Sequence, residues 1–118
     1  MSLEQTEQEC AANAVAPRVS LASMEAKISV RHDFTADEAT GSDVPGYESL
    51  RLLSICLLVM DNGFTIIGKS APASAANFNA ALGRKLAYED AIRQLWPLEG
   101  YALREALSAS KPVEGIPQ

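Results

Sequence analysis

Apolar positions divide the chain into segments with helix-like or strand-like spacing. Near the N-terminus, Leu21, Met24 and Ile28 recur at intervals of three and four residues, and Ser20 stands directly before them. This spacing places the three side chains on one face of a helix, and serine is a favoured N-cap residue. The pattern therefore predicts a short N-terminal helix over residues 20–29.

The middle of the chain predicts an antiparallel β-hairpin. Residues 50–61 are apolar at both odd and even positions, which indicates a strand that is buried on both faces or lies at the centre of a sheet. Asn62-Gly63 follows, and residues 64–70 resume the β-pattern. Asn-Gly between apolar runs favours a two-residue type I′ turn, because both residues tolerate positive φ. The expected strand pairs are Asp61 with Phe64, Val59 with Ile66, and Leu57 with Gly68.

Helical spacing returns in the last third of the chain. Residues 75–96 form the longest helical pattern, and Ser74 is placed to cap it. Pro97 is expected to end this helix, because the residue before a proline is pushed out of the helical region. A short C-terminal helix is expected over residues 99–109.

Together these elements predict an α+β fold in a single domain over residues 19–110. The hairpin forms the sheet, and the long helix and the short C-terminal helix pack on it. Residues 1–18 are expected to be a flexible N-terminal arm, and residues 111–118 a flexible tail. Residues 31–47 have loop composition, and the length of this loop makes it either mobile or functional.

Composition narrows the classes of function. The chain has 118 residues, 47% of them hydrophobic and 21% charged, as expected for one globular domain. Its net charge of −5 argues against binding to duplex nucleic acid or to an anionic membrane. No secretory signal is visible, and no apolar run approaches the roughly 20 residues that span a membrane. We therefore expect a cytoplasmic protein.

The sequence shows no catalytic or metal-binding motif. Cys10 and Cys56 lack the spacing of a zinc site, and we expect neither a metal nor a cofactor. His32 stands beside Asp33, but adjacency in sequence is weak evidence for a catalytic pair. No serine or cysteine stands in a nucleophile motif, so no catalytic residue is predicted.

The candidate ligand site lies where charged residues interrupt the apolar face of the predicted helix 75–96. Lys85 and Glu89 fall near the middle of that face and are four residues apart, so they can pair. Either the pair is structural, at an edge of the packing, or it contacts a ligand or a partner subunit. Guanidinium groups bind phosphate and aromatic rings stack on bases, so a small nucleotide is one chemically suitable ligand. The alternative is that Trp96 is a core anchor and the arginines are solvated. The candidate ligand-binding residues are Arg84, Lys85, Glu89, Trp96, Arg104, Tyr88 and Tyr101.

The same helix predicts a homo-oligomer. Its apolar face is wide for one hairpin to cover, and Gly83 with Ala87 offers a small-residue surface for a second helix. The residues of that face are Phe78, Leu82, Leu86, Tyr88, Ile92 and Trp96.

The order of motifs resembles that of a known family. An apolar strand precedes Asn62-Gly63-Phe64, a second strand carries Gly68 and Ser70, and the helix carries Asn77-Phe78, Gly83-Arg84-Lys85 and Trp96-Pro97-Leu98. In this order the chain resembles, over roughly residues 19–108, a family of small tailed-phage and prophage proteins of the N-four-like and Sf-six-like podovirus type. One departure is Lys69, where the family pattern has Glu. The resemblance implies a phage or prophage origin and carries no assigned activity.

These features lead to one functional prediction and two alternatives. The prediction is a phage-encoded, non-enzymatic accessory protein for counter-defence or host takeover that sequesters a small nucleotide signal, which rests on fold-level analogy. The first alternative is a protein–protein module that binds and modulates a host protein through the acidic 31–47 loop or an exposed helix face. The second is a small hydrolase, whose motifs are missing.

Overall fold

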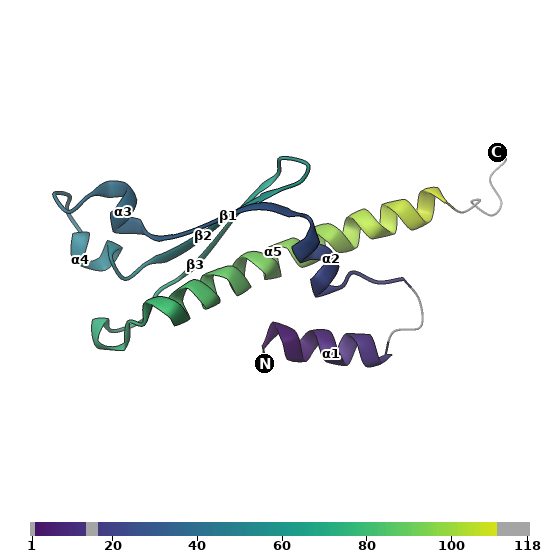
Figure 1. Ribbon diagram of the computed structural model, residues 1–118, viewed down its shortest axis with the longest axis horizontal. Coiled ribbons are helices and arrows are strands. Elements are labelled where there is room, and N and C mark those ends of the chain that lie inside the picture. Colours follow the sequence, from purple (N-terminus) through teal and green to yellow (C-terminus); the bar gives the residue numbers. More distant parts are fainter. Residues whose placement is uncertain (1, 14–16, 111–118) are drawn as a thin grey trace.

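The structure, a computed structural model, describes residues 2–13 and 17–110, so the predicted tail at 111–118 lies outside the described residues. Three strands form one antiparallel sheet in the order β1-β2-β3, and the long helix α5 runs along one face of it (Figure 1). The predicted α+β class is confirmed. The elements are α1 (Leu3–Asn13), α2 (Leu21–Ala26), β1 (Ile28–Thr35), α3 (Ala36–Thr40), α4 (Tyr47–Leu50), β2 (Ser54–Met60), β3 (Thr65–Ser70), the 3₁₀ turn η1 (Ala75–Asn77) and α5 (Ala80–Ala109).

The third strand, β1, was not predicted. Most of it lies in the 31–47 segment, for which a loop was expected, and the rest of that segment holds the short helices α3 and α4. β1 pairs with the whole of β2, so that Phe34 lies opposite Ile55 and Val30 opposite Val59. Its sequence does alternate, since Ile28, Val30 and Phe34 are separated by polar residues. The prediction divided this stretch between the helix expected over residues 20–29 and the segment of loop composition, so the strand was missed.

The hairpin is present, but the predicted turn and register were wrong by one residue. Gly63 donates its N–H to the Met60 carbonyl at 2.8 Å and has φ +87, whereas no non-glycine residue in the described part of the chain has positive φ. The loop therefore has three residues, with Gly63 alone in the left-handed region, a common alternative to the type I′ turn. The strand pairs are consequently Val59 with Thr65, Leu58 with Ile66, Leu57 with Ile67 and Cys56 with Gly68.

The helix α5 is continuous through Pro97, so the predicted break into helices 75–96 and 99–109 was wrong. A proline inside a helix removes one backbone hydrogen bond, here to the carbonyl of Arg93. Both residues are exposed, so water can satisfy that carbonyl. The start also differs, because Asn79 caps α5 by accepting from the Leu82 N–H at 3.0 Å. The predicted cap Ser74 instead caps the turn η1.

The core lies between α5 and the sheet, and small residues bring the two together. Ala87 and Ala91 are fully buried against β3, and a Cβ atom on Gly68 would lie 2.0 Å from the Ala87 carbonyl oxygen. The predicted apolar face was therefore rotated: Leu82 is 50% exposed, and Leu86 is also exposed. The core residues are Leu3, Leu21, Met24, Cys56, Leu58, Met60, Ile66, Ala87, Ala91, Ile92 and Leu95.

Gly83 also faces the sheet, contrary to its predicted position on an outer surface for a second helix. A Cβ atom there would lie 2.3 Å from the Ser54 hydroxyl oxygen. The chain's own sheet therefore covers the small-residue surface of Gly83 and Ala87, one of the two features behind the predicted homo-oligomer.

The segment expected to be a flexible arm contains the helix α1. Leu3 is buried in the core, and the Glu7 carboxylate accepts from Arg18 at 2.5 Å and from the Leu21 N–H at 2.8 Å. These contacts hold α1 to the start of α2. The Arg18 hydrogen bond, reinforced by the Leu21 N–H and the Arg18 charge, keeps the pKa of Glu7 below its ordinary value despite partial burial.

Over residues 2–13 and 17–110, no helix combines the length and apolar character that a transmembrane span requires.

Candidate binding surfaces

The two faces of the sheet have different surroundings. Even-numbered residues of β2 face α5 and are buried, whereas its odd-numbered residues point the other way. We call the second side the outer sheet face. Strand register arranges it in three rows: Val30, Val59 and Thr65; His32, Leu57 and Ile67; Phe34, Ile55 and Lys69.

The outer sheet face is largely apolar and is left open. Ile67 is 60% and Val30 39% exposed, and the apolar side chains of β2 on this face are half-buried. Among the described helices, α5 packs on the opposite face and none packs across this one (Figure 1). Its charged side chain is Lys69, its other ionisable side chain is His32, and it carries no carboxylate. A contiguous exposed apolar patch of this kind is typical of an interaction surface.

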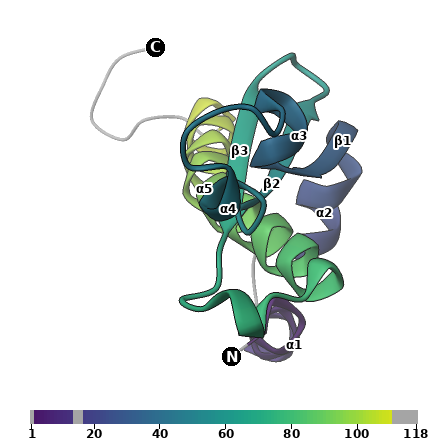
Figure 2. The same ribbon diagram turned by 90° about the vertical axis from the view of Figure 1, so that its left-hand side faces the viewer.

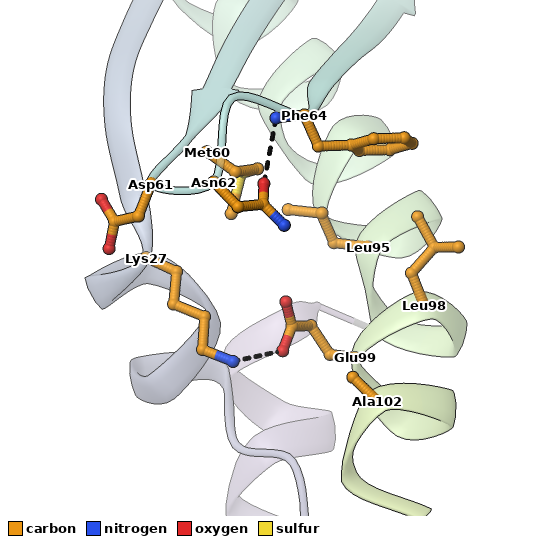
Figure 3. Close-up of a pocket in the computed structure, with 9 residues that line it drawn as sticks. All are labelled: Lys27, Met60, Asp61, Asn62, Phe64, Leu95, Leu98, Glu99 and Ala102. Carbon is orange, nitrogen blue, oxygen red and sulfur yellow. Dashed lines mark hydrogen bonds and ion pairs between the residues drawn. The ribbon is translucent and has the colours of Figure 1, made fainter. Parts of the chain in front are cut away.

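A pocket of about 470 Å³ lies where the hairpin turn, the end of α2 and α5 meet (Figure 3). Its volume falls in the range of small-molecule sites. Met60 and Leu95 form an apolar floor, and the exposed side chains of Phe64 and Leu98 stand at one side. The lining residues are Lys27, Met60, Asp61, Asn62, Phe64, Leu95, Leu98, Glu99 and Ala102.

The polar groups of this pocket largely satisfy one another. Lys27 Nζ lies 2.6 Å from Glu99 Oε2, and the Asn62 side-chain oxygen accepts from the Phe64 N–H at 3.0 Å (Figure 3). The Asn62 amide nitrogen points toward the pocket centre, and the Asp61 carboxylate points away from it. The pocket thus offers a donor and an apolar floor, but its one ammonium group is already paired with a carboxylate.

The predicted ligand-binding residues are not gathered into one site. Arg84 and Arg104 are both exposed on α5, and their separation of twenty positions corresponds to about 30 Å along a helix. Tyr101, on the second half of α5, is 69% exposed. Trp96 is half-buried and packs against the core.

Lys85 and Glu89 do not form a pair in the described structure. Lys85 is exposed, whereas Glu89 is only 6% exposed. Neither residue belongs to the ion pairs that join Glu7 to Arg18, Lys27 to Glu99, Arg31 to Asp33 and Glu48 to Arg51.

Tyr88, also a predicted site residue, belongs to a polar network that sequence analysis missed. Its hydroxyl donates to Glu25 on α2 at 2.5 Å, and the Arg31 guanidinium carbon lies 4.1 Å from its ring centroid. Arg31 Nε in turn donates to Asp33 at 2.9 Å. Burial, together with the Glu25 hydrogen bond, raises the pKa of Tyr88. The network joins α2, β1 and α5. Because Tyr88 is far in sequence from Glu25 and Arg31, no local sequence motif predicts it.

Cys56 lies beside this network on the helix-facing side of β2. Burial, followed by the Asp33 charge, raises the pKa of its thiol to about 11. A thiol with this pKa is protonated at neutral pH, which fits a core residue. Across the described ranges, no group of three or more His, Cys, Asp or Glu side chains is placed to hold a metal ion.

Comparison with known proteins gives one match. No curated protein and no solved structure matches the chain significantly. A family model described as phage protein (N4 Gp49/phage Sf6 gene 66) family matches residues 19–107, which is most of the chain. This range contains all three strands and nearly all of α5. The chain therefore belongs to the N4 Gp49/phage Sf6 gene 66 family of phage proteins.

Proposed function

We propose that this phage-family protein is a non-enzymatic accessory protein that binds another protein through its outer sheet face. The observation that carries the proposal is the open apolar surface of three strands, with Ile67 and Val30 exposed on it. On the other side of the same sheet, α5 covers side chains of the same character. Leaving one apolar face without such a cover costs solvation free energy that a bound partner would recover.

The charge of the outer sheet face supports a specific kind of partner. Lys69 and His32 lie on it without a carboxylate, although the chain as a whole has a net charge of −5. Electrostatic complementarity then favours a partner that is apolar at its centre and acidic at its rim. This supports the protein–protein alternative and moves the epitope from the 31–47 loop to the sheet.

Sequestration of a small nucleotide remains the second candidate, and the pocket beside the hairpin turn is the observation in its favour. Phe64 supplies an aromatic ring and Asn62 a donor, but Lys27 is already paired with Glu99. The distance between Arg84 and Arg104 gives this candidate less support than the sheet face gives to protein binding. Titration calorimetry against cyclic oligonucleotides decides it, since silence across the panel removes this candidate.

Affinity purification from phage-infected host cells tests the protein-binding proposal. Tagged wild type is compared with Ile67→Asp, which puts a carboxylate on the outer sheet face, and with the matched control Leu82→Asp. Both positions are highly exposed, at 60% and 50%, so neither change should lower the melting temperature much.

A stoichiometric partner should be recovered with wild type and with Leu82→Asp, and reduced about tenfold or more with Ile67→Asp. Equal recovery with both variants, or the absence of any stoichiometric partner, would contradict the proposal. The mass of the pure protein by light scattering shows separately whether it is already an oligomer.

A further inference from the structure

The two edges of the sheet are treated differently. On β3, the Lys69 N–H donates to the Asp90 carboxylate at 3.0 Å, and the Ile67 carbonyl accepts from the Gln94 side chain at 2.7 Å. Side chains of α5 thus bond to two of the outward backbone groups of this edge, the Lys69 N–H and the Ile67 carbonyl. Figure 2 shows β3 beside α5 and β1 at the opposite edge of the sheet.

The register identifies which backbone groups of β1 are free to pair. Met60 N–H donates to the Phe64 carbonyl, so even-numbered residues of β2 exchange hydrogen bonds with β3. Because these bonds alternate in antiparallel sheets, odd-numbered residues of β2 bond to β1, through Val30, His32 and Phe34. The N–H and C=O groups of Arg31 and Asp33 therefore point outward from the edge.

This edge is accessible. Residues 29–33 are all exposed, and in the described structure no side chain is bonded to the outward backbone groups of Arg31 or Asp33. The irregularity in β1 lies between Ile28 and Val30, so residues 30–35 pair regularly with β2 and present a straight edge. Outward backbone groups on such an edge form a template for another strand.

We propose that β1 is the interface between two copies of this chain, which pair antiparallel about a two-fold axis at His32 and join their sheets into one of six strands. The edge is complementary to itself in this register. Arg31 lies opposite Asp33 of the partner subunit, and Asp33 opposite Arg31 of the partner subunit. Val30 and Phe34 form the neighbouring apolar pairs across the axis. An interface that uses the same patch on both copies closes at a dimer.

The charges on the edge favour this register over neighbouring ones. Opposite charges directly across a strand pair stabilise it, and like charges destabilise it. A shift of two residues in either direction removes both Arg–Asp pairs. Arg31 and Asp33 now bond within one chain at 2.9 Å, and both side chains are partly exposed, so they are free to share these contacts with a second copy.

The inference goes beyond the proposed function, since it concerns the sheet edge and a second copy of the chain. It leaves the outer sheet face open and places two such faces side by side. It also differs from the predicted oligomer, which rested on the wide apolar face of the helix together with Gly83 and Ala87.

The first test uses the wild-type protein alone. Light scattering should give a dimer mass, and hydrogen exchange should show protection of the Arg31 and Asp33 amides that is lost on dilution. The His32 amide, which bonds to β2, is the internal control and should stay protected. A monomer mass, or a dimer whose Arg31 and Asp33 amides exchange freely, would overturn the proposal.

The second test separates pairing between chains from pairing within one chain. Arg31→Asp and Asp33→Arg each place like charges across the interface, so each should raise the dimer dissociation constant about tenfold or more. Mixing the two variants should restore the dimer as a heterodimer, although each chain by itself still carries two like charges.

The control is Arg51→Asp, which breaks an exposed ion pair with Glu48 away from the edge and should leave the dimer unchanged. Failure of the mixture to dimerise, with both variants folded by circular dichroism, would refute the interface. Arg31→Asp could fail to fold because it loses the contact of Arg31 with Tyr88. In that case the proposal is tested by the wild-type hydrogen-exchange pattern and by the dimer dissociation constant of Asp33→Arg.

Discussion

At the scale of single residues, glycine and alanine set how closely α5 approaches the sheet. A Cβ atom on Gly68 would lie 2.0 Å from the Ala87 carbonyl oxygen and 2.8 Å from the Ala91 Cβ atom. The Ala87 carbonyl oxygen is part of the helix backbone and the Ala91 Cβ atom is attached directly to it, so neither atom can move away by a side-chain rotation. At Gly83 the nearest atom is the hydroxyl of Ser54, which ends a rotatable side chain. The two glycines therefore differ in how much they tolerate a side chain.

Gly68→Ala should destabilise the protein by about 1–3 kcal/mol, because the added methyl group forces strand and helix apart. The matched control is Gly100→Ala, where nothing lies within 4 Å of the new Cβ atom and α5 is helical. That change should stabilise by up to about 1 kcal/mol through helix propensity. Urea unfolding of the two variants measures both effects. If Gly68→Ala were as stable as wild type, β3 and α5 could not pack as closely at Gly68 as described.

At the scale of elements, α5 has to be one rigid unit. Its first half covers the sheet, and its second half extends beyond the sheet beside α2 (Figure 1). The Lys27–Glu99 ion pair and the hairpin-turn pocket both depend on this extension. A break at Pro97 would have let the chain fold back and would have removed that pocket.

Pro97→Ala tests the continuity of α5. The change restores an N–H that can reach the carbonyl of Arg93, and both residues are exposed, so the variant should gain about 1–3 kcal/mol in stability. The helical signal in circular dichroism should stay the same or rise. The exposed Leu98→Ala is a control for a small side-chain change in the same turn. A loss of stability in Pro97→Ala would indicate that the helix is broken there.

At the scale of the whole molecule, α1 is held to the domain by a small set of contacts. Leu3 enters the core, and Glu7 bonds to Arg18 and to the Leu21 N–H. Because the pKa of Glu7 is lowered in the folded state, its carboxylate stabilises the fold above its unfolded pKa. That contribution is lost as the pH falls through the lowered pKa.

Glu7→Gln should therefore lower the melting temperature at neutral pH and have progressively less effect below about pH 5. Melting curves of wild type and variant between pH 7 and pH 3 give the difference directly. Glu4→Gln, an exposed position on the same helix, should behave like wild type throughout. If the difference in melting temperature between wild type and Glu7→Gln did not depend on pH, the ionised carboxylate of Glu7 would not be what holds α1 to the domain.

The sequence by itself determined the fold class, the hairpin and the family. Strong local signals carried these predictions: Asn62-Gly63 between apolar strands, and long helical spacing after residue 75. Tertiary contacts decided the rest. Gly68 has to face α5, which moved the register by one residue. Contacts of α5 with the sheet before Pro97 and with α2 after it, including the Lys27–Glu99 ion pair, kept the helix continuous against its local preference.

The binding surfaces were likewise decided by the tertiary structure. Lys85 and Glu89 stood out because they fell at the middle of the predicted apolar face of the helix. The face that packs on the sheet is a different one, because the small residues Ala87 and Ala91 lie against β3. β1 was missed although Ile28, Val30 and Phe34 alternate with polar residues, because Ile28 also fits the helical spacing of Leu21 and Met24 and the residues from Arg31 onward have loop composition. The outer sheet face and the open edge arise only when β1 pairs with β2, which joins residues 19 to 32 positions apart in the sequence. Local patterns report local preferences, whereas a surface is defined by which distant segments meet and which are left uncovered.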